Sequence, residues 1–179
     1  MALTDKQRGV LKGVISGAVI TAVVLAAAIA ISPVSLSPEA LVSERIAFAL
    51  KADLVLALYL AFSVGRLGRH RFFTPEDIDG GGLTHGTDQA NVLQSILQNT
   101  LEQTVLAVLV HTTWAATMPL SWSSAVPAAV IMFLCGRVLF ARGYSGGAPS
   151  RALGFALTFY PTVLMLVVIT IKVVYELVV

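Results

Sequence analysis

The sequence predicts an all-α integral membrane protein, because it is apolar, poor in charge and organised in long segments. Of its 179 residues, 56% are hydrophobic and 12% are charged, and the mean hydropathy is +0.83. Soluble domains carry about 25% charged residues. The apolar segments are continuous rather than alternating, which favours membrane-spanning helices over a β-barrel. We therefore expect the lipid bilayer as a partner and no nucleic acid.

The first apolar segment, from Gly13 to Ile31, follows a short basic stretch. It is longer than the roughly 7–15 residues of a signal-peptide core, which favours a retained transmembrane helix. The cleavage-like Ala28–Ala30 leaves a signal peptide open as the alternative. Gly9, Gly13 and Gly17 recur every four residues, and this spacing predicts a face on which another helix packs closely.

Four more helices follow in one domain, which we place at residues 45–179 after an additional N-terminal helix and turn at residues 1–44. The four helices are expected from about Ala47 to Val64, from a cap at Thr87 or Asp88 to Thr117, from Ser124 to Arg142, and from Ser150 to Val174.

Between the second and third helices lies the hydrophilic loop Phe72–Gly86. Thr74, with Asp77 three residues later, predicts a capping box there. Asp77 and Asp79 resemble part of a calcium loop, but the other ligands are missing, so we expect no metal site. The single cysteine, Cys135, offers no disulfide and is expected to be a small core residue.

Charge placement predicts the orientation. If five helices alternate, nine of the twelve lysines and arginines fall on one side and three on the other. Basic residues prefer cytoplasmic loops, so the N-terminus is expected in the cytoplasm and the C-terminus outside. The nine are Lys6, Arg8, Lys12, Arg66, Arg69, Arg71, Arg137, Arg142 and Arg151, and the three are Arg45, Lys51 and Lys172.

The third helix begins polar and ends apolar. On a helical period, a polar stripe forms along its first half, made of Gln94, Ser95, Gln98, Asn99 and Glu102. A carboxylate in a membrane helix costs about 2.5–3.5 kcal/mol at the bilayer centre and less near its surface. We therefore expect Glu102 to face protein and to pair with Arg137 or Arg151. The alternative is a structural polar stripe that joins helices.

The turn between the last two helices supplies a second group of polar residues. Arg137, Phe140 and Tyr144 share a helix face, and Arg151 lies in the first turn of the last helix. A cation at that point opposes the helix dipole, which suggests that an anion binds beside it. An arginine with only a topological role is the alternative. Together with Asn99 and Glu102, these residues suit a small zwitterionic peptide that carries an extra carboxylate.

The chain from about Arg45 to Val179 resembles a divergent, prokaryotic-type member of the MAPEG family, the membrane-associated proteins of eicosanoid and glutathione metabolism. The resemblance is carried by Asn99-x-x-Glu102 after a basic loop and by the spacing of Arg137, Tyr144 and Arg151. It implies a four-helix bundle, here with one additional N-terminal transmembrane helix, assembled as a homotrimer that binds glutathione between subunits. The Asn91–Glu102 stripe would then face the interior or a subunit boundary.

The resemblance also implies residue roles. Asn99, Glu102, Arg137, Tyr144 and Arg151 would hold glutathione, and one of three basic-loop arginines would stabilise its thiolate; the candidates are Arg66, Arg69 and Arg71. Three positions depart from residues that the family often uses: Ser95 where an arginine is frequent, Gln103 where a tyrosine is common, and Phe140 where some members have tyrosine.

Three functions remain open from the sequence. The first is a glutathione-dependent transferase or peroxidase that acts on lipophilic electrophiles, favoured by the intact Asn99, Glu102 and Arg151. The second is a non-catalytic membrane protein that binds a lipid or another small ligand, favoured by the three departures. A small transporter is the third. The sequence does not identify the substrate.

Overall fold

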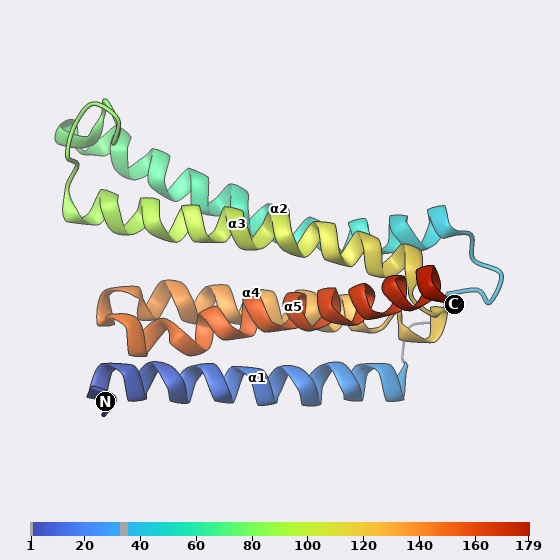
Figure 1. The fold of residues 1–179 in the computed structure, drawn as a ribbon. Coiled ribbons are helices and arrows are strands. Elements are labelled where there is room, and N and C mark those ends of the chain that lie inside the picture. The colour runs from blue at the N-terminus through green and yellow to red at the C-terminus, as the bar shows by residue number, and fades with distance from the viewer. Residues whose placement is uncertain (1, 33–35) are drawn as a thin grey trace.

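The computed structural model describes residues 2–32 and 36–179. Within these ranges the regular secondary structure is entirely helical (Figure 1). The long helices are α1 (Asp5–Ile31), α2 (Val42–Phe73), α3 (Asp88–Thr117), α4 (Ala125–Gly143) and α5 (Ala148–Val178), and the short 3-10 turns are η1 (Pro75–Asp77), η2 (Leu120–Trp122) and η3 (Tyr144–Gly146). This confirms the predicted all-α class.

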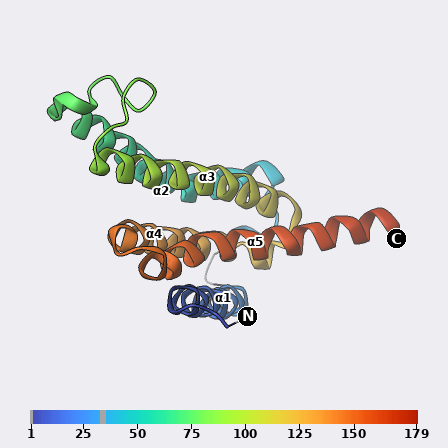
Figure 2. The ribbon, with the colours of Figure 1, turned by 60° about the vertical axis from the view of Figure 1, so that its left-hand side comes forward.

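The helices lie in three tiers (Figures 1 and 2). Helices α2 and α3 form an antiparallel pair, α4 and α5 form a second pair, and α1 packs along α5. The two termini lie at opposite ends of the bundle (Figure 1), and the end that holds the N-terminus is called the N-terminal end below.

Four helical segments of the described chain are long and apolar enough to cross a membrane, namely those that contain α1, α2, α4 and α5. Helix α3 has similar length, but its first half is polar, and it runs antiparallel to α2 (Figure 1). The chain is therefore a multi-pass integral membrane protein.

Helix α1 begins eight residues before the predicted start. Thr4 caps it, and the side chains of Thr4 and Gln7 form a reciprocal capping box, so the basic N-terminal stretch is already helical. The predicted glycine face meets α5. A Cβ added to Gly13 would lie 2.8 Å from Ala152 Cβ and 2.9 Å from Leu153 N, so only glycine allows this approach.

The apolar core is densest at the end of the bundle away from the N-terminus. There α1, α3, α4 and α5 bury Leu25, Trp114, Val126 and Met165 in one cluster. The Trp114 indole donates a hydrogen bond to the carbonyl of Trp122, 3.1 Å away, which fixes the turn between α3 and α4. This packing sets how α3 and α4 sit relative to each other, and therefore the arrangement of polar residues at the opposite end.

Helix α2 is longer than predicted. The expected span ended near Val64, whereas the helix continues through the basic stretch Gly65–Arg71 to Phe73.

Cys135 is also exposed rather than buried in the core. The surface of an apolar helix in a membrane is itself apolar, so hydrophobic neighbours in the sequence do not distinguish a buried cysteine from one that faces lipid.

Candidate functional site

Arg137 lies at the centre of a polar cluster between α3, α4 and α5, and its side chain is only 1% exposed. Its guanidinium donates to Asn99 Oδ1 over 2.8 Å and to the Thr158 hydroxyl. It also lies 4.6 Å from the centre of the Phe140 ring. Among the described residues, no carboxylate forms an ion pair with it. A buried cation is thus held by an amide, a hydroxyl and an aromatic face.

A cavity of about 420 Å³ opens beside this cluster, at the N-terminal end of the bundle. Helix spacing explains its composition, because residues four apart lie on one face. Ser95 and Asn99 reach it from α3, while Phe140 and Tyr144 reach it from the end of α4 and η3. The complete lining is Val10, Val14, Ser95, Asn99, Phe140, Tyr144, Ala148, Arg151, Ala152 and Phe155.

Aromatic contacts hold the charged and polar residues in and behind this cavity. The Arg151 guanidinium lies 4.2 Å from the centre of the Tyr144 ring. The Phe140 and Tyr144 rings pack edge to face, with centroids 5.5 Å apart. Phe140 therefore separates Arg137 from the cavity while touching both. Of the five predicted binding residues, Asn99, Tyr144 and Arg151 line one cavity, and Arg137 lies directly behind it.

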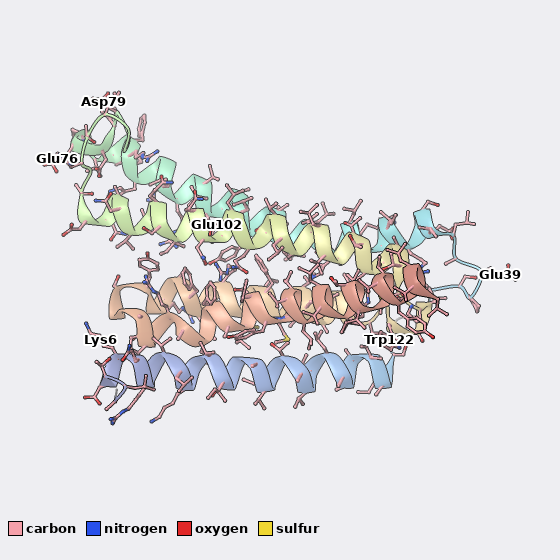
Figure 3. The ribbon with its side chains drawn as sticks, in the orientation of Figure 1. Lys6, Glu39, Glu76, Asp79, Glu102 and Trp122 are labelled. Carbon is pink, nitrogen blue, oxygen red and sulfur yellow. The ribbon has the colours of Figure 1, made fainter. Side chains whose placement is uncertain are left out.

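Glu102 does not join this group, and the predicted pairing with Arg137 or Arg151 is wrong within the single chain. The side chain is exposed, and its Oε1 accepts a hydrogen bond from Gln98 Nε2 over 2.9 Å. Figure 3 shows the position of Glu102 on α3, in the upper tier of the bundle. The reason is angular: at 100° per residue, the step from Asn99 to Glu102 turns the side chain about 60° around the helix. The polar stripe of α3 is therefore wide enough for Asn99 to contact Arg137 of α4 while Glu102 lies on the exposed surface.

The predicted thiolate arginines occupy a different place. Arg66 and Arg69 line a second cavity of about 380 Å³, between the end of α2 and the start of α3, together with His70 and Phe73. Arg71 instead donates to Gln94 Oε1 over 3.1 Å. In one chain, therefore, the basic stretch and the Asn99 cavity form two separate sites.

Asp77 organises the connection between α2 and α3. Its carboxylate accepts hydrogen bonds from the Thr87 N–H and hydroxyl, both at 2.7 Å, and lies 2.9 Å from His70 Nε2. Thr74 makes no capping bond, so the expected capping box is wrong; Thr87 caps α3, as one of the two predicted alternatives. The Thr87 side-chain hydrogen bond is the largest cause of a lowered Asp77 pKa, and His70 adds to it. The ionised carboxylate thus holds α3 in place.

A buried pair of ionisable residues in the membrane-spanning region was not predicted from the sequence. His111 Nδ1 and Asp53 Oδ1 are 2.7 Å apart, and the side chains are 1% and 4% exposed. The available signal was an aspartate and a histidine inside two apolar runs, since intramembrane ionisable residues pair with one another. Thr158, the hydroxyl partner of Arg137, was also missed.

In the part of the chain that the structure describes, no cluster of three or more histidine, cysteine, aspartate or glutamate residues could hold a metal ion. The cavity instead offers an amide, a phenol and an arginine. This donor set suits an anionic or zwitterionic organic molecule.

Comparison with known proteins agrees with the architecture. The model of the MAPEG family matches residues 46–171, which covers α3, α4 and most of α2 and α5. No curated protein and no solved structure matches the chain. Helix α1 lies outside the matched region. Because the family model covers more than half of the sequence, the chain belongs to the MAPEG family.

Proposed function

We propose that this protein is a glutathione-dependent transferase or peroxidase that acts on lipophilic electrophiles. The observation that carries the proposal is the single cavity lined by Asn99, Tyr144 and Arg151, with Arg137 behind it. Arg151 offers a bidentate contact for a carboxylate, and Asn99 and Tyr144 offer hydrogen bonds to a peptide. The cavity is of the size expected for a small-molecule site.

A homotrimer would complete this site. Glu102 is exposed on one chain, and Arg66 and Arg69 line a separate cavity, so none of the three meets Asn99 inside one protomer. A neighbouring subunit could bring a basic surface to the glutathione thiol and could cover Glu102. Arg66 and Arg69, which line this second cavity, are favoured as thiolate candidates over Arg71, whose guanidinium donates to Gln94.

The chemistry requires little from the protein beyond binding and charge. An arginine beside the sulfur favours the thiolate over the thiol, because opposite charge stabilises the ionised form. In the transferase reaction, the thiolate sulfur bonds to an electrophilic carbon and the leaving group departs with the electron pair. The arginine stabilises the anion and does not itself gain or lose a proton.

Titration of glutathione onto the detergent-purified protein tests the proposal. Arg151→Ala should weaken binding about 10- to 100-fold, as a lost hydrogen bond to a charged group costs about 1.5–3 kcal/mol. Arg142→Ala is the matched control, because Arg142 lies in the last turn of α4, near the start of α5, but does not line the cavity. Absence of both a binding heat and a melting shift at saturating glutathione would refute the proposal.

A kinetic comparison tests the role of the basic stretch. Arg66→Ala or Arg69→Ala should slow turnover of a generic aryl halide while leaving glutathione affinity unchanged. Such a division separates stabilisation of the reacting sulfur from binding that is equal in the ground and transition states.

Native mass spectrometry in mild detergent should detect trimers, and a spectrum that contains only monomers would contradict the shared site.

The non-catalytic alternative is favoured by Phe140, which covers Arg137 where some family members have tyrosine. The phenyl ring supplies no hydroxyl to a ligand. Under this alternative, the same cavity binds a lipid-like anion. Binding of such a ligand without any binding of glutathione would distinguish the two functions.

A further inference from the structure

Helix α1 contributes a wall to the candidate site. Val10 and Val14, one turn apart on α1, line the same cavity as Asn99, Tyr144 and Arg151. Both valines are partly buried. Helix α1 precedes the region matched by the family model, so this wall is added to the family bundle. The cavity therefore has a polar side made by α3 and α5 and an apolar side made by an additional helix.

The position of this wall along the bundle is fixed. Gly9 faces Pro149, Gly13 faces Ala152 and Gly17 faces Ala156, so three successive turns of α1 are seated on three successive turns of α5. A sliding or rotated α1 would force backbone atoms into side chains, because each contact requires the absence of a Cβ. Val10 and Val14 are consequently held over the cavity.

The opposite face of α1 is directed outward. Ile15 and Val19 are 54% and 57% exposed, as expected for side chains that face lipid. Helix α1 thus stands between the surrounding bilayer and the cavity on this side of the molecule. A lipophilic molecule that occupies the cavity must fit its apolar part against the two valines.

We propose that α1 closes the cavity against the bilayer and that Val10 and Val14 limit the length of the lipophilic group that the site accepts. The proposal deepens the function suggested above and rests on it in treating the lipophilic group as that of a substrate. Short alkyl or aryl electrophiles should fit, whereas long unbranched chains should collide with the wall.

Thiol labelling inside the cavity tests the wall directly, without need of catalysis. Ser95 lines the cavity, and Cys135 is the single native cysteine. The full chain carrying Ser95→Cys and Cys135→Ser is reconstituted in liposomes and treated with N-ethylmaleimide or N-octylmaleimide. The labelling rate is measured with both reagents for each variant. Because Ser95 is exposed as well as lining the cavity, only the change in the octyl-to-ethyl rate ratio between variants reports how well the cavity admits a long chain.

Val10→Ala with Val14→Ala should raise this ratio about tenfold. Ile15→Ala with Val19→Ala is the matched control, with the same helix and the same kind of truncation, and should leave the ratio unchanged. Val14→Phe should lower the ratio, so that an effect of opposite sign excludes a simple loss of folding. An unchanged ratio in the first pair, or an equal rise in the control pair, would overturn the proposal.

A protection arm separates this inference from the proposed function. S-methylglutathione, which has no free thiol to consume the reagent, should slow labelling of the cysteine at position 95 if glutathione occupies the cavity. Length discrimination without protection would refute the glutathione function and retain the wall. Protection without length discrimination would refute the wall and retain the function.

Discussion

The pair formed by Asp53 and His111 should be a major determinant of stability. Its Nδ1 and Oδ1 atoms are 2.7 Å apart between α2 and α3, and both side chains are almost fully buried. The second atom of each group, Asp53 Oδ2 and His111 Nε2, has no hydrogen-bond partner among the described residues. Each side chain therefore depends on the other for its buried polar contact.

The magnitude follows from this mutual dependence. Removal of one hydrogen-bond partner leaves the other buried group unsatisfied, which costs about 1–3 kcal/mol and more where that group is charged. A neutral hydrogen bond between membrane helices contributes less, about 0.6 kcal/mol on average and up to about 1.7. We expect Asp53→Ala and His111→Ala each to lower the free energy of unfolding by about 3 kcal/mol. The double variant should lose less than the sum, with a coupling of at least about 1 kcal/mol.

Unfolding of the four proteins of this double-mutant cycle by SDS in mixed micelles measures the coupling. The space left by each truncation is present in both a single variant and the double variant, so it largely cancels in the cycle. Lys51→Ala, an exposed charge on the same helix, is the control and should have little effect. Losses that add within about 0.5 kcal/mol would refute the pairing.

Four further outcomes are expected. The lowered Asp77 pKa means that its ionised form stabilises the α2–α3 connection. This contribution to the free energy of unfolding is complete above the ordinary pKa of 3.8 and is lost as the pH falls through the lowered pKa. Acid unfolding of Asp77→Asn should therefore lack that component. Arg137→Ala should lower the free energy of unfolding by about 1–3 kcal/mol, because buried acceptors lose their donor, and SDS titration would measure this. Glu102→Ala should change the stability of a single protomer by less than about 0.5 kcal/mol, since the side chain is exposed, while a loss near that of Arg137→Ala would contradict its placement. Gly13→Leu should detach α1 from α5, and hydrogen exchange in α1 should rise, whereas unchanged exchange would show that the contact tolerates a side chain.

The helical class was predictable because hydrocarbon leaves a chain few choices. Backbone groups in a bilayer must be satisfied within each segment, so a long apolar run such as Gly13–Ile31 becomes a helix irrespective of its neighbours. The boundaries were less predictable. The capping box at Thr4 extends α1, and the helix formed by Gly65–Arg71 extends α2, because polar residues near a membrane surface are compatible with either helix or loop.

The candidate site was predictable where helix periodicity alone places a residue. Asn99, Tyr144 and Arg151 line one cavity, because each lies on the inner face of its own helix close to one end of the bundle. Glu102 could not be placed in this way. It is near the edge of the polar stripe, and whether it meets an arginine depends on the packing angle between α3 and α4 rather than on its own helix.

The sequence by itself determined the apolar helices, the membrane class and the polar stripe of α3, since these follow from the period of each segment and from the cost of polar groups in lipid. Only the tertiary structure decided which stripes meet. It paired Asp53 with His111 across two helices, gave Arg137 a hydroxyl partner in Thr158, and seated α1 on α5 so that Val10 faces the cavity. Contacts of this kind depend on the relative rotation and offset of whole helices, and these are set by the packing of many side chains together.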